Sequence, residues 1–249
     1  MRFDIITIFP EIFDSYFNES MIKRARAKKL VDIKVHDLRK FSRDKHKKVD
    51  DRPYGGGPGM VLKAEPIARA IESLLKPSTS KSQFSIFKRR TKVVLFSAGG
   101  KQFTQKTARD WAKKNDRLIM VAGRYEGVDS RIESVIVNCK LKIENLSIGP
   151  YVLTGGELPA MVLIDAISRH VPGVLGKEES LEERRHGVGV PVYTRPEKFI
   201  WRGRIYSVPK VLLIGDHKKI AAWREVRQRA SRQKRGSLFG AAPLAAHKI

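Results

Sequence analysis

Glycine-bearing segments that could hold a small molecule recur in the middle of the chain. They are Ser97 to Gly100, Gly123 to Gly127 and Ser147 to Gly156. Each follows or borders a short apolar run with the length and β-branched content of a strand. In parallel α/β sheets, ligands bind beyond the carboxyl ends of the strands, where glycine lets the backbone approach them closely. We therefore expect these segments to form a small-molecule site.

A further glycine-rich segment, Tyr54 to Met60, excludes two common cofactor classes rather than indicating one. It lacks the Lys and Ser/Thr that follow the glycines of a phosphate-binding loop. The Gly-x-Gly-x-x-Gly spacing of nicotinamide-binding proteins also follows none of the expected strands. A mobile lid or an RNA-contacting turn both remain open, and the basic stretch from Arg39 to Arg52 favours RNA.

A nearly uniform apolar run, Glu157 to Val171, predicts a helix that is buried or faces a second subunit. Asp165 and Arg169 lie four residues apart on it and so share a face. The pair has two interpretations. From the residues alone it is an intrahelical ion pair. The second interpretation, in which Asp165 orients Arg169 towards a substrate, comes only with the family resemblance given below, and both can hold.

Short strands alternate with helical stretches along the chain, and this order is typical of an α/β fold with a largely parallel sheet. The expected strands include Phe3 to Phe9, Val93 to Phe96 and Leu118 to Ala122. The expected helices include Glu65 to Leu75 and Lys106 to Lys114. The polar segment Pro77 to Ser82 reads as an exposed loop.

The charge balance indicates a polyanionic partner. The 249 residues carry 50 Lys and Arg against 26 Asp and Glu, a formal net charge of +24. The charge is clustered, most clearly in an expected helix from Asp216 to Arg235, where phosphate contact is favoured over a merely solvated face. The one cysteine, Cys139, excludes a disulfide within the chain. With no apolar run long enough for a signal peptide or a membrane span, a cytoplasmic protein is expected.

Taken together, these segments resemble the bacterial tRNA (guanine-N1)-methyltransferases, which modify the guanine 3′ of the anticodon. The resemblance covers most of the chain, from residue 3 to about residue 227. The residues that carry it are Phe9-Pro10-Glu11, Asp44 to Lys47, Asp50 to Met60, Gly123 to Gly127, Ser147 to Ala160, Pro172 to Gly176 and Tyr193 to Pro196.

The resemblance implies a fold and an assembly that periodicity alone does not. It implies an α/β domain with a deep trefoil knot (SPOUT) over residues 1–176, a linker over 177–190, and a small basic helical tRNA-binding domain with a tail over 191–249. It also implies a homodimer with the active site between subunits. Transfer RNA would be the partner, with no DNA or membrane involved. No metal-ligating residues are evident in the sequence, which leaves open whether a divalent ion assists.

By the same resemblance, S-adenosyl-L-methionine would be the methyl donor, held largely by backbone groups of the strand-end loops. The implied cofactor residues are Ser97, Gly123, Tyr125, Glu126, Ile148, Gly149, Pro150, Tyr151, Val152, Leu153, Gly155 and Gly156. Tyr125 and Glu126 would lie where the cofactor and the target guanine meet. The implied tRNA contacts are Asp50, Arg52, Tyr54, Gly59 and Arg195.

Guanine N1 carries a proton at neutral pH, so methylation needs a base for that proton and a positive group for the charge that collects on O6. Arg169 matches the family arginine that faces O6, and Glu126 could accept hydrogen bonds from the guanine edge. The chain departs from the family at two positions. Arg184 stands where the family has its catalytic aspartate, so the adjacent Glu183 is the candidate base, with a solvated linker as the alternative. Pro150 stands where an acid is usual.

Two other functions fit parts of the same sequence. One is an RNA-binding protein of this fold that has lost or altered its catalysis, as the replaced aspartate suggests. The other is a knotted methyltransferase that acts on a different RNA, since a shared fold does not fix the substrate.

Overall fold

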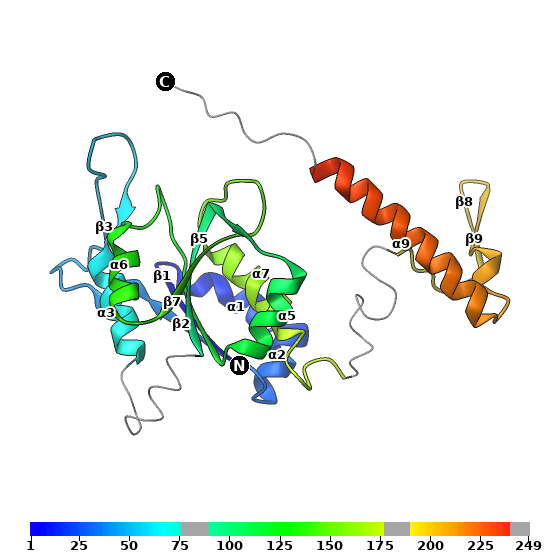
Figure 1. Ribbon diagram of the computed structural model, residues 1–249, viewed down its shortest axis with the longest axis horizontal. Helices are drawn as coiled ribbons and strands as arrows, with labels where there is room; N and C mark the ends of the chain where they lie inside the picture. The colour runs from blue at the N-terminus through cyan, green and yellow to red at the C-terminus, as the bar shows by residue number, and fades with distance from the viewer. Residues whose placement is uncertain (76–89, 177–189, 240–249) are drawn as a thin grey trace. The chain divides into compact units, whose positions relative to one another are not determined.

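The computed structural model describes residues 1–75, 90–176 and 190–239. The chain divides into two compact units, Met1–Leu175 and Gly176–Ile249. Figure 1 shows the first unit as a sheet with helices on both sides, and the second as a long helix, α9 (His217–Phe239), with a hairpin. Each unit is treated by itself below.

The sheet of the first unit has five strands, and every neighbouring pair in it is parallel. Their order across the sheet is β2-β1-β6-β5-β7. The strands are β1 (Arg2–Thr7), β2 (Asp32–Asp37), β5 (Thr91–Gln102), β6 (Arg117–Val121) and β7 (Lys142–Ser147). The predicted α/β class with a largely parallel sheet is confirmed.

Helices cover both faces of this sheet because its strands alternate their apolar side chains between two cores. On β6, Leu118 and Met120 belong to one core, and Ile119 and Val121 belong to the other. The first core packs against α1 (Asp14–Phe17), α2 (Ser20–Ala27), α5 (Gln105–Lys114) and α7 (Glu157–Ser168). The second core packs against α3 (Ala64–Leu75) and α6 (Arg131–Asn138).

Short elements fill the connections of the first unit. They are the 3-10 helices η1 (Pro10–Phe13) and η2 (Leu38–Phe41) and the antiparallel pair β3 (Asp50–Asp51) and β4 (Val61–Leu62). The β3–β4 pair brackets the glycine-rich segment that contains Tyr54 and Gly59. This segment is therefore a loop anchored at both ends.

Strand β5 is interrupted where the first glycine segment lies. Its register with β7 shifts between Phe96 and Lys101, so the residues between them leave the regular ladder. A Cβ atom on Gly100 would lie 2.7 Å from the backbone nitrogen of Leu146. Glycine is required there because the two backbones approach too closely for a side chain.

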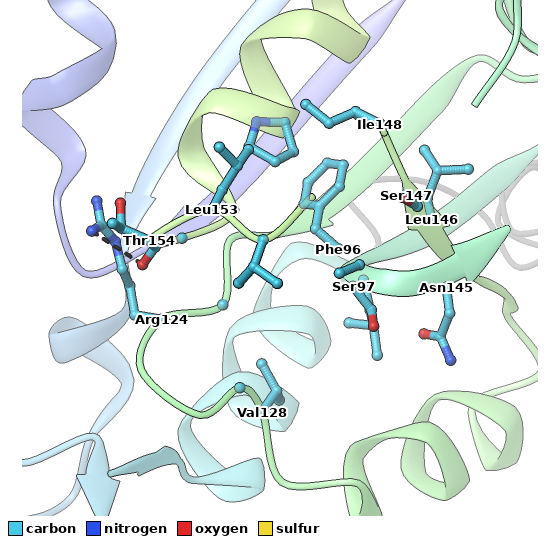
Figure 2. Close-up of a pocket in the computed structure, with 18 of the residues that line it drawn as sticks. Phe96, Ser97, Arg124, Val128, Asn145, Leu146, Ser147, Ile148, Leu153 and Thr154 are labelled. Atoms are coloured by element: carbon cyan, nitrogen blue, oxygen red, sulfur yellow. Dashed lines mark hydrogen bonds between the residues drawn. The ribbon is translucent and has the colours of Figure 1, made fainter. Parts of the chain in front are cut away.

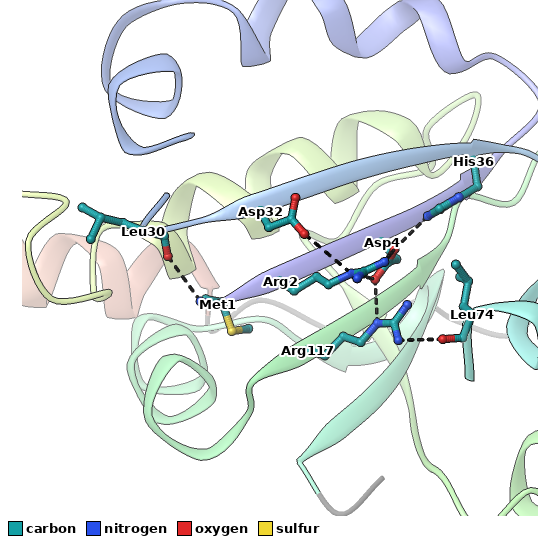
Figure 3. Close-up of polar contacts among 8 residues, drawn as sticks. All are labelled: Met1, Arg2, Asp4, Leu30, Asp32, His36, Leu74 and Arg117. Atoms are coloured by element: carbon teal, nitrogen blue, oxygen red, sulfur yellow. Dashed lines mark hydrogen bonds and ion pairs between the residues drawn. The ribbon is translucent and has the colours of Figure 1, made fainter. Parts of the chain in front are cut away.

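A buried charge cluster connects the three adjacent strands β2, β1 and β6 (Figure 3). The carboxylate of Asp4, on β1, is fully buried. It accepts hydrogen bonds from Arg117 Nε on β6 at 2.6 Å and from Arg2 Nε at 2.8 Å, and it contacts His36 Nε2 on β2 at 2.7 Å. Burial opposes ionisation, but these hydrogen bonds outweigh it and hold the pKa of Asp4 well below its usual value.

The second unit contains the helix α9 (His217–Phe239), a 3-10 turn η4 (Lys210–Leu212) and the antiparallel pair β8 (Lys198–Trp201) and β9 (Arg204–Ser207). The predicted basic helix starts one residue after Asp216, whose carboxylate accepts the backbone N–H groups of Lys218 and Lys219 at 3.0 and 3.1 Å. The hairpin β8–β9 was not predicted.

Several predictions fall outside the described residues. These are the loop at Pro77–Ser82 and most of the linker, including Glu183 and Arg184. The trefoil knot stays a prediction. Among the described residues, no helix is both long enough and apolar enough to cross a membrane.

Candidate functional site

A cavity of about 360 Å³ lies at the carboxyl ends of the neighbouring strands β5, β6 and β7. Its wall is built from the three glycine segments that follow or interrupt those strands. Figure 2 shows Phe96 and Ser97 of β5, Arg124 after β6, Ser147 at the end of β7, and Ile148, Leu153 and Thr154 after β7 around it. The volume lies within the range of sites for small molecules and cofactors.

Nearly all of the predicted cofactor residues line this cavity. They are Ser97, Gly123, Tyr125, Glu126, Ile148, Gly149, Tyr151, Val152, Leu153, Gly155 and Gly156. Pro150 is exposed and does not line the cavity. The parallel sheet brings these loops together because it aligns the carboxyl ends of its strands along one edge.

Other residues of the wall were not singled out from the sequence. Two of them are polar and bonded to each other: Asn145 Nδ2, on β7, donates to Glu133 Oε1, on α6, at 2.8 Å. Phe96 adds an apolar surface. Asn145 and Phe96 precede the glycine segments by two residues or fewer, so extending each segment into its strand would have found them.

Two glycines hold the loops of the wall against each other. The backbone N–H of Gly156 donates to the carbonyl of Gly123 at 2.8 Å. A Cβ atom on Gly156 would lie 2.7 Å from Cα of Ala122 and 3.0 Å from the Gly123 nitrogen, which is too close for any side chain. The loops after β6 and β7 can therefore meet only if residue 156 is glycine.

A buried ion pair fastens the same two loops. Glu157, with its side chain 2% exposed, accepts Nε of Arg124 at 2.9 Å through Oε2. Its Oε1 accepts the hydroxyl of Thr7 at 2.8 Å. The Arg124 guanidinium also lies over the ring of Phe9, 4.7 Å from its centroid. The end of β1 thus braces one side of the cavity wall.

The glycine-rich loop between β3 and β4 reaches the cavity at Glu126. The backbone N–H of Glu126 donates to the carbonyl of Met60 at 3.1 Å, and Leu62 donates to Gly127 at 3.0 Å. A Cβ atom on Gly59 would lie 2.6 Å from Oε1 of Glu126. Among the predicted tRNA contacts, Gly59 therefore lies beside the cavity. Tyr54 is 99% exposed at the tip of the loop, and Asp50 and Arg52 lie at its base.

Arg169 does not line the cavity; it caps the carboxyl end of α7, whereas the cavity borders the amino end of that helix. Twelve residues of α-helix separate the two ends, a rise of about 18 Å. Asp165 accepts a hydrogen bond from the hydroxyl of Tyr16. Partial burial, followed by this hydrogen bond and the charge of Asp165, raises the pKa of Tyr16 to about 12.

Leu158, Val162, Asp165 and Arg169 follow helical spacing along one face of α7. Leu158 and Val162 are 55% and 45% exposed, whereas Leu163, Ile164 and Ile167 on the other face are fully buried. Arg169 therefore continues an exposed apolar stripe. The predicted burial of this helix is confirmed for the face with Leu163, Ile164 and Ile167, and the subunit-facing alternative stays a prediction for the other face.

The remaining predicted residues lie elsewhere. Arg195 belongs to the second unit and lines a separate cavity of about 970 Å³ with Tyr193 and Ile220. Glu183 lies outside the described residues. Within the described ranges, no cluster of three or more His, Cys, Asp or Glu side chains is arranged to hold a metal ion.

Comparison with known proteins gives one consistent result. A family model described as tRNA (guanine-1)-methyltransferase TrmD matches residues 1–241. The chain is 48% identical over 227 residues to a tRNA (guanine-N(1)-)-methyltransferase of Dictyoglomus turgidum, covering 90% of this chain and 83% of the relative. It is 43% identical over 248 residues to a protein of the same name from Dehalococcoides mccartyi strain BAV1, covering 98% and 92%. A third, from Thermomicrobium roseum, is 46% identical over 229 residues, covering 91% and 78%.

Proposed function

The chain belongs to the tRNA (guanine-1)-methyltransferase TrmD family, and we propose that it transfers the methyl group of S-adenosylmethionine to N1 of guanine 37 in tRNA. Methylation of guanine N1 in tRNA follows from the family and from relatives of that name. The identity of the methyl donor, the position of the guanine and the site residues are our proposal. The observation that carries it is the cavity at the ends of β5, β6 and β7.

The residues present fit S-adenosylmethionine. Much of the cavity wall is loop, and it includes a glycine, Gly156, whose Cβ atom would collide with the opposite loop. The carboxylate of Glu133 and the amide of Asn145 add the hydrogen-bonding groups that ribose hydroxyls and an adenine edge require. Phe96 and Leu153 provide apolar contact for the purine.

When bound, S-adenosylmethionine supplies a methyl group on a positively charged sulfur, which needs no acid because a neutral thioether is left behind. The residues of this chain then have two tasks on the guanine. A carboxylate takes the N1 proton, and a cation stabilises the negative charge that moves to O6 as that proton leaves. We assign the first task to Glu183 and the second to Arg169. Glu126, beside Gly59 at the cavity rim, accepts hydrogen bonds from the guanine edge.

The position of Arg169 supports a site shared between two copies of the chain. Within one chain it lies about 18 Å along α7 from the end that borders the cavity. It also continues the exposed stripe of Leu158 and Val162, an apolar surface of the kind that a subunit interface covers. A homodimer in which α7 faces its partner brings Arg169 of one copy to the cavity of the other.

The net charge of +24 supports a tRNA substrate for the assembled protein, since a basic surface draws in and holds a polyphosphate chain. Because tRNA is a cytoplasmic molecule in bacteria, we propose that the protein acts in the cytoplasm. In this scheme the second unit, with the basic helix α9, holds the tRNA while the first unit carries the chemistry.

The proposed base is tested by comparing Glu183→Gln with Glu182→Gln, a matched change one residue away. Methyl transfer to tRNA is measured in single turnover across pH, with saturating S-adenosylmethionine. Loss of a general base lowers the rate by roughly 100-fold or more, so Glu183→Gln falls by that amount while Glu182→Gln stays near wild type. Equal rates for the two variants would remove Glu183 from the mechanism, and an inactive wild type would leave only RNA binding.

A further inference from the structure

The hairpin β8–β9 of the second unit presents an unusual surface. Its strands, Lys198–Trp201 and Arg204–Ser207, are joined by Arg202 and Gly203, which both have positive φ angles, 51° and 74°. Two adjacent residues with positive φ are typical of the tight turn that suits the twist of paired strands. All eight strand residues are exposed to solvent.

The pairing register sorts the hairpin into an aromatic face and an aliphatic face. Residues directly opposite each other on two antiparallel strands share a face, and successive pairs alternate. Phe199 pairs with Tyr206 and Trp201 pairs with Arg204, so these residues form one face. Lys198, Ser207, Ile200 and Ile205 form the other face.

The aromatic face is ordered by a contact between two of its rings. The rings of Phe199 and Tyr206 stack with their centroids 5.2 Å apart and an interplanar angle of 15°. Phe199, Trp201 and Tyr206 nevertheless remain 55%, 62% and 45% exposed. A two-stranded hairpin is only marginally stable in water. Neighbouring large rings that stay exposed on so small an element are typical of a surface that binds a partner.

The charge of the hairpin favours RNA as its partner. Residues 198–207 contain Lys198, Arg202 and Arg204 and no acidic residue. Aromatic side chains combined with basic ones are the features by which proteins hold unpaired nucleotides, because a ring stacks on a base while the cation contacts phosphate. The faces of paired bases are covered by their neighbours, so this surface suits a loop rather than a duplex.

We propose that the aromatic face of the β8–β9 hairpin, formed by Phe199, Trp201, Tyr206 and Arg204, binds unpaired bases of the substrate tRNA by stacking. Arg202 and Lys198 contact the phosphates on either side. The proposal rests on the proposed function only in taking tRNA as the substrate. It adds a base-stacking contact to the electrostatic attraction that the basic chain exerts on any polyanion.

The test measures tRNA affinity by fluorescence anisotropy and methyl transfer by single turnover for full-length variants. Trp201→Ala and Tyr206→Ala each weaken tRNA binding roughly 10-fold, the loss expected for one stacked base. Trp201→Phe keeps a ring and stays within about 2-fold of wild type. Ile200→Thr and Ile205→Thr, on the opposite face of the same strands, are the matched controls and leave affinity unchanged.

Salt dependence separates stacking from charge. The aromatic variants keep the slope of log affinity against log salt, whereas Arg202→Gln reduces the slope by about one. Wild-type affinity for Trp201→Ala and Tyr206→Ala overturns the proposal. So does a loss of dimer in sedimentation for these variants, because the face would then cover a second copy of the chain. An inactive wild type that binds tRNA through the hairpin would instead contradict the proposed function alone.

Discussion

Arg124 and Glu157 form an ion pair, with Nε and Oε2 2.9 Å apart, that joins the loop after β6 to the first turn of α7. Thr7 holds the second oxygen of the same carboxylate from the end of β1. Arg124 also donates to the carbonyl of Thr154 at 3.4 Å. One buried carboxylate thus fixes three segments around the cavity.

Removing the charge of Glu157 should loosen this arrangement. Glu157→Gln keeps a group that can accept from Thr7 but replaces the charged partner of Arg124 by a neutral one. The expected cost is about 2 kcal/mol in the free energy of unfolding, the size of a hydrogen bond to a charged group. Urea unfolding measures the cost, and calorimetric titration with S-adenosylmethionine should show weaker binding.

The control for this change is Glu225→Gln, which removes a carboxylate from an ion pair on α9. Glu225 and Arg229 are 2.6 Å apart, but their side chains are 59% and 74% exposed. Such a pair contributes at most about 0.5 kcal/mol. If both variants lost the same free energy of unfolding, the ion pair of Glu157 would not stabilise the cavity wall.

Gly156→Ala should damage the cavity without removing any functional group. Its Cβ would lie 2.7 Å from the Cα of Ala122, where only backbone movement can relieve the overlap. We expect a loss of about 1–3 kcal/mol in stability and at least roughly 10-fold weaker S-adenosylmethionine binding, since 1.4 kcal/mol is a factor of ten.

Gly99→Ala is the matched control for this overlap. A Cβ atom on Gly99 meets nothing within 4 Å, although the residue belongs to the interrupted part of β5. Calorimetric titration of both variants makes the comparison. If Gly156→Ala bound S-adenosylmethionine as tightly as Gly99→Ala does, close contact between the loops after β6 and β7 would not shape the site.

Asp4 should make stability depend on pH in acid. Its pKa is lowered in the folded protein, so its contribution is fully present above its unfolded pKa of about 3.9 and is lost as pH falls towards the folded value. Wild-type stability should therefore fall below about pH 4. Asp4→Asn should cost about 3–5 kcal/mol at neutral pH and show a flatter acid limb.

The comparison for Asp4 is Asp32→Asn. Asp32 lies 3.8 Å from the same Arg2, but its side chain is 53% exposed. Urea midpoints from neutral to acid pH should be close to those of wild type for this variant. If the free energy of unfolding of Asp4→Asn fell as steeply with acid as that of wild type, other carboxylates would be the cause of the fall in stability.

Mixed dimers test whether the site is shared. In the proposed homodimer, Arg169→Ala should be inactive, and Gly156→Ala should lose at least about nine-tenths of its activity when S-adenosylmethionine is held well below the wild-type Kd. A dimer of one chain of each kind keeps an intact cavity in the first chain and an intact Arg169 in the second, so it should recover about half of the activity if residues from two copies meet. Differently tagged chains allow the mixed dimer to be isolated, and an inactive mixed dimer would place Arg169 at the site of its own chain.

The sequence was most informative where local patterns decide the structure. The short apolar run Leu118 to Ala122 predicted β6, and glycines after strands predicted the cavity wall, because both signals lie within a few residues. The contact between Thr7 and Glu157 spans 150 positions, and no local pattern encodes it. The β8–β9 hairpin was missed because four-residue strands exposed on both faces carry no hydrophobic alternation.

Arg169 shows that the sequence can indicate which residues share a helix face without indicating how far they lie from the cavity. Its spacing from Asp165 was evident, but only the structure gives its separation from the cavity along α7, because that requires knowing which end of the helix meets the loops. The exposure of Leu158 and Val162 on the same face could not be predicted either. In the sequence they look the same as the buried Leu163 and Ile164.

The most direct test of the account is the identity of the methylated nucleoside. Purified protein is incubated with labelled S-adenosylmethionine and a tRNA that has guanine at position 37, and the tRNA is then digested and its nucleosides are separated by mass. The account predicts label in N1-methylguanosine, and none when adenine replaces guanine 37. Label in another nucleoside, or no transfer by a protein that binds both S-adenosylmethionine and tRNA, would contradict it.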